Sequence, residues 1–342
     1  MTCDRCYESA RNGCRFCPYC GEILGSDPEP SRHDAGTSGM DVLIKLIAPL
    51  ILLVLTVEFA YLWAGSVMTF DWLSGKSVDI LLLVPMLVSP FQLSGLALQL
   101  LWVFIILAIT VSAIILVKEL IQTVGEERSG NATAFRNSSI YWLVMLFCAD
   151  MLISIVLAMT SSSGDIPEFE TGFAPQAIFE FADAAVWEEV ITRIGYIGIP
   201  MAVAALVCKK EKAWKYLLGG FGFSKLAVAL LIISSLVFGF AHLPGWGIWK
   251  VLPTALGGVL MGYLYIRFGV HVCIIFHFIL DFTSVMMDGL GLYLLGVFML
   301  GTIIIGLFCI PMMLSRFWGY RDSLKELPKI FSDDHSSSFF KR

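Results

Sequence analysis

Residues 179–207 read FEFADAAVWEEVITRIGYIGIPMAVAALV, an apolar stretch that carries Glu188, Glu189 and Arg193 near its middle. The stretch is long enough to cross a bilayer, which takes a helix of about 20 residues. Placing a Glu or an Arg at the bilayer centre costs roughly 2.5–3.5 kcal/mol for each residue on insertion scales. Charged residues at that depth are mostly functional, so this segment indicates both the class of protein and a candidate site.

The rest of the chain predicts an all-α polytopic membrane protein of about eight transmembrane helices. Hydrophobic residues make up 57% of the 342 residues and charged residues only 15%, against about 25% in a soluble protein. The predicted spans are 42–64, 93–117, 140–160, 177–207, 226–243, 251–267, 270–287 and 290–314. Residues 78–92 are apolar but interrupted by Pro85 and Pro90, which predicts a short re-entrant or interfacial piece.

The expected domains are a Cys-rich module at 1–24, a flexible linker at 25–39, a membrane domain at 40–318 and a cytoplasmic tail at 319–342. With eight spans both termini lie on one side, and most Lys and Arg residues, including KKEKAWK at 209–215, fall on that side. The positive-inside rule therefore predicts cytoplasmic termini, with Lys76 and Lys250 as exceptions on the opposite side. Nothing resembles a basic patch for nucleic acid.

Five of the nine cysteines fall within the first 20 residues, MTCDRCYESARNGCRFCPYC. Cys3 and Cys6 form one CxxC pair, and Cys17 and Cys20 form a second; two such turns can complete a tetrahedral Cys₄ zinc site. We therefore predict a small zinc ribbon holding a structural Zn²⁺ and offering a surface to a protein partner. Cys14 could replace one ligand, and a redox-sensing or unstructured cysteine cluster is the alternative.

Six polar residues of the membrane domain form the candidate site. Glu189 and Arg193 are spaced i, i+4, the spacing at which an acid pairs with a following base, and Arg193 is expected to make a bidentate contact. Glu188 lies about 100° around the helix from Glu189 and, once desolvated, would suit a general base. The candidate set is Glu188, Glu189, Arg193, His242, His277 and Asp281.

The histidines complete the hydrolytic interpretation. His242 and His277 would come from separate helices to polarise a water or stabilise an oxyanion, and Asp281, one turn after His277, could orient that ring. A catalytic metal is an open alternative, although neither HExxH nor HxxEH is present. A structural salt-bridge cluster is the simpler interpretation of the three charges alone. His271, beside Arg267, is expected at the membrane interface.

Three motifs in order, EExxxR (188–193), FxxxH (238–242) and HxxxD (277–281), resemble the CPBP family of intramembrane proteases, which includes CAAX prenyl endopeptidases and Abi-like bacterial proteins. The resemblance covers about residues 140–314. It implies a protease-like helical core with a polar cavity, Glu188 as base, and either a membrane protein or a lipidated peptide as substrate. CAAX endopeptidases typically carry Asn where this chain has Asp281, and an ionised Asp cannot donate a hydrogen bond.

Two other function classes compete with an intramembrane endopeptidase. A non-enzymatic family member would act in bacteriocin immunity or as a membrane scaffold or assembly factor, with the zinc ribbon as its partner-binding arm. A transporter could use the same acids as a proton relay. Loss of cleavage on Glu188 substitution separates the first hypothesis from these two.

Overall fold

The computed structural model describes residues 39–84, 87–131, 133–160, 170–210, 212–287, 289–323 and 327–330. The predicted zinc ribbon at 1–24, with Cys3, Cys6, Cys17 and Cys20, lies outside these residues, as do nearly all of the linker and the end of the tail. The zinc prediction therefore stays a prediction.

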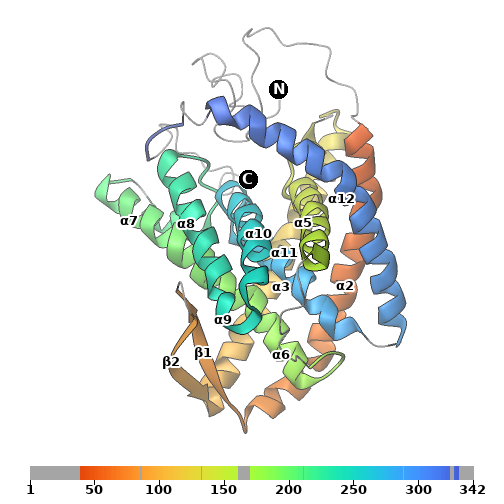
Figure 1. Cartoon of the computed structure of the whole chain (residues 1–342), viewed down its shortest axis with the longest axis vertical. Helices are drawn as coiled ribbons and strands as arrows, with labels where there is room; N and C mark the ends of the chain where they lie inside the picture. The colour runs from red at the N-terminus through yellow and green to blue at the C-terminus, as the bar shows by residue number, and fades with distance from the viewer. Residues whose placement is uncertain are drawn as a thin grey trace.

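The described chain is built almost entirely of helices (Figure 1). The long ones are α2 (Gly39–Leu73), α3 (Gly95–Arg128), α5 (Ser139–Thr160), α8 (Lys225–Ala241), α10 (Ile248–Arg267), α11 (Val270–Phe282) and α12 (Gly289–Ser323). Short helices are α4 (Ala134–Asn137), η3 (Ala213–Leu218), α9 (Leu243–Trp246) and η4 (Thr283–Met286). The segment 175–207 forms one further long helix of mixed geometry, described below.

Six helices are long and apolar enough to cross a membrane: 39–73, 95–128, 139–160, 175–207, 225–246 and 291–315. Each of the eight predicted spans falls largely on a helix, with residues 93 and 94 in a strand, but α10 and α11 are not among these six. The outward faces of the long helices carry large exposed apolar side chains, for example Leu46, Ile121 and Leu300. Such a surface suits lipid rather than water, so the chain is an integral, multi-pass membrane protein.

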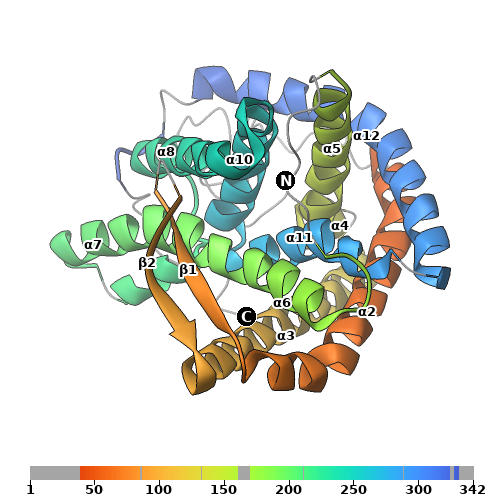
Figure 2. The ribbon, with the colours of Figure 1, turned by 60° about the horizontal axis from the view of Figure 1, so that its bottom comes forward.

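Helix α11 lies at the centre of the bundle (Figure 2). It contacts α2, α3, α5, α6 (Pro175–Asp183) and α10. Its residues 271–279 are all buried, so this short helix contacts protein and not lipid on every side. A residue in the middle of α11 is therefore held at the core of the protein, which is where His277 lies.

Residues 77–83 and 87–94 are strands, a secondary structure that the sequence did not predict for this region, while its re-entrant or interfacial location stays a prediction. They form an antiparallel hairpin of β1 (Ser77–Leu83) and β2 (Leu87–Ser94), with a register irregularity between Ile80 and Leu82. The hairpin sits at one end of the molecule (Figure 1), where it contacts α3 and α8. Pro90 lies within β2, on one of the two strands of an isolated pair, where a missing amide is tolerated.

The helix that carries the charged residues changes geometry along its length. It begins as α6, widens into two π-helical stretches, η1 (Ala184–Glu188) and η2 (Val190–Gly198), and ends as α7 (Ile199–Val207). Pro200 has no amide to donate to the preceding turn, which removes one bond of the regular α ladder. π-helical turns are rare and occur frequently at functional sites. Here Glu188 is the last residue of η1, and Glu189 lies between η1 and η2.

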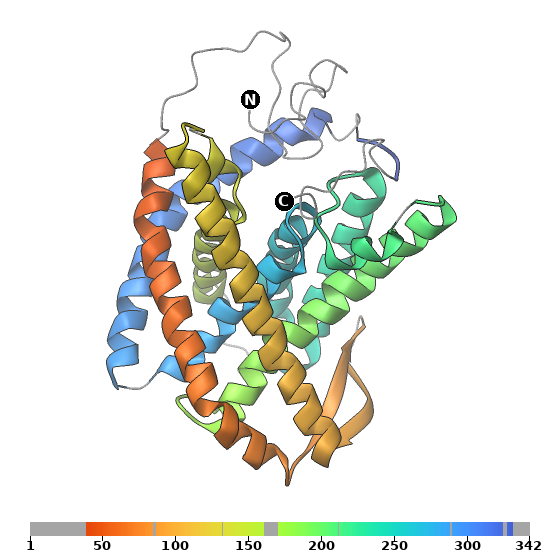
Figure 3. The same cartoon turned by 180° about the vertical axis from the view of Figure 1, so that it is seen from behind.

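Segment 327–330 packs against the start of α8. The amides of Lys225 and Leu226 donate to the carbonyls of Pro328 (2.9 Å) and Lys329 (3.1 Å). Helix α12 runs to Ser323, beyond the predicted end of the membrane domain at 318. The start of the predicted tail is thus structured and tied to the first turn of α8 (Figure 3).

The loop between η3 and α8 sets the position of α8 against α10. Gly220 N donates to Tyr265 O (2.8 Å), and the Tyr265 hydroxyl donates to Leu217 O (2.7 Å). Gly219 has a φ of +80°, and a Cβ at this position would lie 2.4 Å from Tyr265 O. Only glycine fits both the backbone conformation and the close approach.

Substituting Gly219→Ala should therefore destabilise the protein by at least about 2 kcal/mol, because the methyl group pushes Tyr265 O away while the backbone is held in an unfavourable conformation. The measurement is thermal unfolding of the detergent-solubilised protein, followed by tryptophan fluorescence. Gly125→Ala is the matched control, since a Cβ at Gly125 meets nothing within 4 Å. Equal stability of both variants would contradict this account of the loop.

Candidate active site

Glu189 and Arg193 form a completely buried ion pair at the closed end of the site. Their side chains are both 0% exposed, and Arg193 Nε donates to Glu189 Oε2 at 3.0 Å. The predicted pairing is present, but the expected bidentate contact is wrong. Arg193 Nη1 instead donates to Ser234 Oγ on α8 (3.1 Å), which in turn donates to Thr192 O (2.6 Å). The arginine therefore ties η2 to α8 as well as neutralising Glu189.

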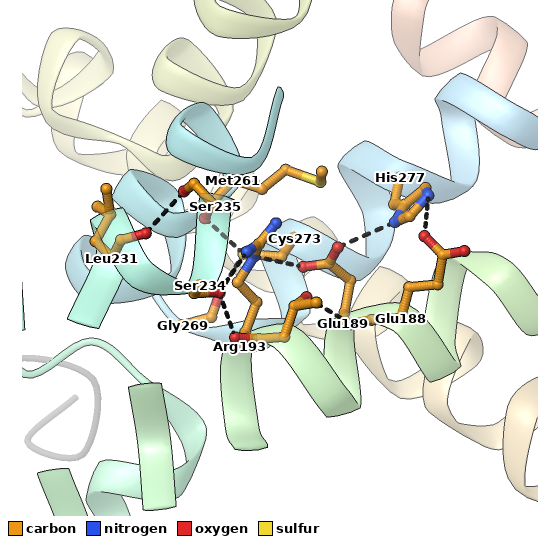
Figure 4. A network of polar contacts seen from close by, with 11 residues as sticks. Glu188, Glu189, Arg193, Leu231, Ser234, Ser235, Met261, Gly269, Cys273 and His277 are labelled. Carbon is orange, nitrogen blue, oxygen red and sulfur yellow. Dashed lines mark hydrogen bonds and ion pairs between the residues drawn. The ribbon is translucent and has the colours of Figure 1, made fainter. Parts of the chain in front are cut away.

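His277 lies between Glu188 and Glu189 (Figure 4), and the carboxylate of Asp281 is also close to it. Its Nδ1 lies 3.0 Å from Glu189 Oε1, and its Nε2 lies 3.2 Å from Asp281 Oδ2 and 3.8 Å from Glu188 Oε2. The two glutamates thus reach the same imidazole from opposite ring nitrogens. Ionised carboxylates only accept hydrogen bonds, so this surrounding suits an imidazole that donates from both nitrogens.

Glu188 differs from Glu189 in exposure and in contacts. Its side chain is 22% exposed, and within the described residues its carboxylate makes only the 3.8 Å approach to His277. Asp281 is 31% exposed and also faces His277. The site therefore has a closed end at Glu189 and Arg193 and an open end at Glu188 and Asp281, where water or substrate can enter.

His242 ends α8 and belongs to the open end. Its Nδ1 lies 2.8 Å from Phe238 O; a carbonyl only accepts, so Nδ1 must carry the proton. A neutral His242 therefore presents an unprotonated Nε2, which has no protein partner in the described part of the chain. His242 is close enough to Glu188 and Asp281 to interact with both electrostatically.

Phe238 separates and orients the two histidines. Its ring stands edge-on to His242 at 5.0 Å and to His277 at 6.1 Å, measured between ring centroids. The Arg193 guanidinium lies 5.4 Å from the same ring. Because one aromatic ring contacts three site residues, the FxxxH motif supplies a packing core for the site as well as a histidine.

His271 does not join the site. It is buried, and its Nε2 lies 3.3 Å from Glu119 Oε1 on α3. Its expected depth at the membrane interface stays a prediction. Other acids in the membrane domain went without a predicted role. Asp150 on α5 is 3% exposed, lies beside Gly257 and interacts electrostatically with His277 and Asp281. Its single occurrence in an apolar span gave no sequence signal linking it to the site.

A catalytic metal finds no support in the described residues, which contain no group of three or more His, Cys, Asp or Glu side chains arranged to hold an ion. Both nitrogens of His277 face carboxylates instead. A catalytic metal therefore stays the open alternative that the sequence left, and no described residue is assigned to hold one.

Comparison with known protein families identifies the segment that bears the site. Residues 170–283, about a third of the chain, match the family "Type II CAAX prenyl endopeptidase Rce1-like". The match contains all six candidate residues, from Glu188 to Asp281. No curated protein and no solved structure matches the chain. The motif-based resemblance and the family match thus agree on the same part of the sequence.

Removing the guanidinium should reveal how strongly the closed end depends on it. Arg193→Met leaves Glu189 buried beside His277 alone and should lower stability by about 3–5 kcal/mol, the range for breaking a buried ion pair. The double variant Glu189→Gln/Arg193→Met should recover a substantial part of this loss, because no charge is then left uncompensated.

The readout is thermal or denaturant unfolding in detergent. Lys45→Met is the control: Lys45 pairs with Glu127 at 2.7 Å in an exposed position, where a pair contributes at most about 1 kcal/mol. The single variant Glu189→Gln is measured as well. If the stability lost in the double variant equalled the sum of the losses in Glu189→Gln and Arg193→Met, Glu189 and Arg193 would not act as a pair.

Proposed function

We propose that the protein is an intramembrane endopeptidase that hydrolyses a peptide bond of a membrane-associated, lipid-modified substrate. The observation that carries the proposal is the difference in environment between the two glutamates. Glu189 is fixed by Arg193 and His277, whereas the neighbouring Glu188 is partly exposed and free to bind water. The match of this segment to a CAAX prenyl endopeptidase family supports the same reaction class.

In the proposed reaction Glu188 is the general base. It accepts a proton from a bound water, whose oxygen attacks the carbonyl carbon of the scissile bond. The unprotonated Nε2 of His242 can accept a hydrogen bond from the same water and so aim its lone pair at the carbonyl. The carbonyl oxygen becomes an oxyanion as the new C–O bond forms.

His277 is the proposed donor to that oxyanion. Its Nε2 faces the open end beside Glu188, and its Nδ1 is held by Glu189. Asp281 contacts Nε2 in the free protein and, as an ionised acid, would orient the ring rather than donate. Collapse of the tetrahedral intermediate breaks the C–N bond, and the proton taken up by Glu188 passes to the leaving amine. Arg193 holds Glu189 and does not touch the substrate.

The predicted partners follow from this location. A substrate whose cleaved bond reaches a site inside the helical bundle would be anchored in the bilayer, which a lipid-modified peptide achieves. The predicted zinc ribbon at 1–24, holding Zn²⁺ through Cys3, Cys6, Cys17 and Cys20, remains the candidate arm for a protein partner. Cytoplasmic termini likewise remain a prediction of the positive-inside rule.

Replacing Glu188 tests the proposal. Glu188→Gln should lower the rate of peptide cleavage by at least about 100-fold, because the base is lost while the size of the side chain is kept. The assay is cleavage of a farnesylated C-a-a-X peptide by the purified protein in nanodiscs, analysed by mass spectrometry.

Glu180→Gln is the matched control on the same helix. Glu180 accepts a hydrogen bond from Gln176 at 2.9 Å and does not contact the site residues. Its substitution should leave the rate unchanged. Full activity of the Glu188→Gln variant would exclude Glu188 as the base. Absence of any cleavage by the wild type, together with a loss of stability in the variant, would favour the non-enzymatic scaffold hypothesis.

A further inference from the structure

The end of α7 carries a concentrated positive charge. The segment KKEKAWK at 209–215 has four lysines and one acid, Glu211, which lies outside the described residues. The four lysines, which we call the α7 lysine cluster, are Lys209, Lys210, Lys212 and Lys215. Figures 1 and 3 show α7 projecting from the side of the bundle beyond α8, so the helix ends at the lateral edge of the protein.

Two exposed lysines of the cluster adopt the left-handed backbone conformation that favours glycine. As α7 ends, the amide of Lys209 donates to Leu206 O (3.0 Å) and that of Lys210 to Ala205 O (2.8 Å). This pattern of bonds places a left-handed residue directly after the helix, most often a glycine, and here Lys209 has a φ of +54°. Lys212, directly before η3, has the same φ. Glycine would adopt this φ with less strain, so the ammonium groups are what lysine adds at these two positions.

An exposed apolar face of α7 leads directly to the cluster. Val203, Leu206 and Val207 are each more than half exposed, and their i, i+3, i+4 spacing places them on one side of the helix. Trp214, also more than half exposed, lies on η3, which packs against α7. Exposed tryptophan and lysine side chains next to an apolar helix face are typical of the boundary between the hydrocarbon and headgroup layers of a bilayer. The cluster is therefore placed where lipid headgroups would meet it.

The two exposed lysines are not neutralised by the protein. Neither Lys209 nor Lys212 makes an ion pair or a side-chain hydrogen bond within the described ranges. Lys45, by contrast, is paired with Glu127 at 2.7 Å. Interaction with the helix dipole would account for a cation in the last turn of α7, but Lys212 follows only after the chain has left that helix. The positive charge is thus available to an anion from outside the chain.

We propose that the α7 lysine cluster binds the phosphate headgroup of an anionic phospholipid, whose acyl chains lie along the exposed face of α7. The apolar face reaches Val207, two residues before the first lysine, so one lipid can contact both parts of the site. A soluble phosphate would use the lysines alone. Helix α7 continues the helix that carries Glu188 and Glu189, so a bound lipid would hold the end of that helix in the headgroup layer. The lipid site lies outside the candidate active site and does not depend on peptidase activity.

The test compares two lipids that differ in net charge. The full-length protein in a non-ionic detergent is titrated with phosphatidylglycerol and with phosphatidylcholine of the same acyl chains, and binding is measured by native mass spectrometry. Phosphatidylglycerol should bind at least about 10-fold more tightly, since each lysine near anionic lipid contributes about five-fold in affinity. The double variant Lys209→Gly/Lys212→Gly should bring the two affinities to within about 3-fold. Glycine keeps the left-handed conformation at both positions, so the turn is retained while the charge is lost.

Lys118→Gln/Arg128→Gln is the matched control, because it removes two exposed cations that lie ten residues apart on α3. It should leave the preference for phosphatidylglycerol intact, as should Lys209→Arg/Lys212→Arg, which keeps the charge. Equal affinity of the wild-type protein for the two lipids, or a preference that survives the double glycine variant, would overturn the inference. An equal loss of affinity for both lipids in that variant would also overturn it and would assign the lysines to the stability of the turn.

Two competitors distinguish a lipid from other anions. Glycerol phosphate carries the phosphate without acyl chains and should not displace phosphatidylglycerol at equal concentration, because it cannot contact the apolar face of α7. Displacement at equal concentration would overturn the inference in favour of a soluble phosphate. A polyglutamate peptide should also fail to displace the lipid. If it bound more tightly than phosphatidylglycerol through Lys209 and Lys212, the inference would be overturned and the cluster assigned to an acidic protein partner.

Discussion

The Glu189 carboxylate accepts hydrogen bonds from Arg193 and from His277 while it is completely shielded from solvent. A charge in that position costs several kcal/mol unless its partners are held in place. This requirement explains the arrangement around it. Helix α8 supplies Ser234 to the arginine, and α11 brings His277 to the centre of the bundle, where no lipid reaches it. Three helices are thereby fixed relative to one another around Glu189.

Fixing Glu189 gives Glu188 its distinct chemistry. Adjacent residues on a helix point in different directions, and here the π-helical turns let both glutamates reach one imidazole from its two sides. The Glu189 carboxylate holds the His277 ring, and the Glu188 carboxylate remains accessible. A regular α-helix with a single glutamate could provide either the anchor or the base. In the proposed mechanism, the EE pair of the motif provides both from consecutive positions.

The sequence predicted the helical class, the segments that form the helices and the six residues that converge, because apolar runs and i, i+4 spacings are local features. It did not predict the hairpin at 77–94, where an apolar run broken by prolines has no distinctive period. The bidentate arginine was wrong because Ser234 lies 41 residues away in the chain, and such a partner leaves no local signal. Asp150 was without a role for the same reason: its relation to Gly257 and His277 exists only after α5 and α10 have packed.

The hairpin, which the sequence did not predict, is connected to the site through Trp187, the residue preceding Glu188. Trp187 Nε1 donates to Leu81 O at 2.9 Å, at the irregular point of the β1–β2 register. This bond engages a carbonyl within the irregular stretch of the ladder, and it holds the hairpin against the π-helical segment. Leu82 and the outward face of η2, including Ile191 and Ile194, line an apolar hollow between the two. The orientation of Glu188 therefore depends on packing on both faces of its helix: the ion network on the inner face and the hairpin on the outer one.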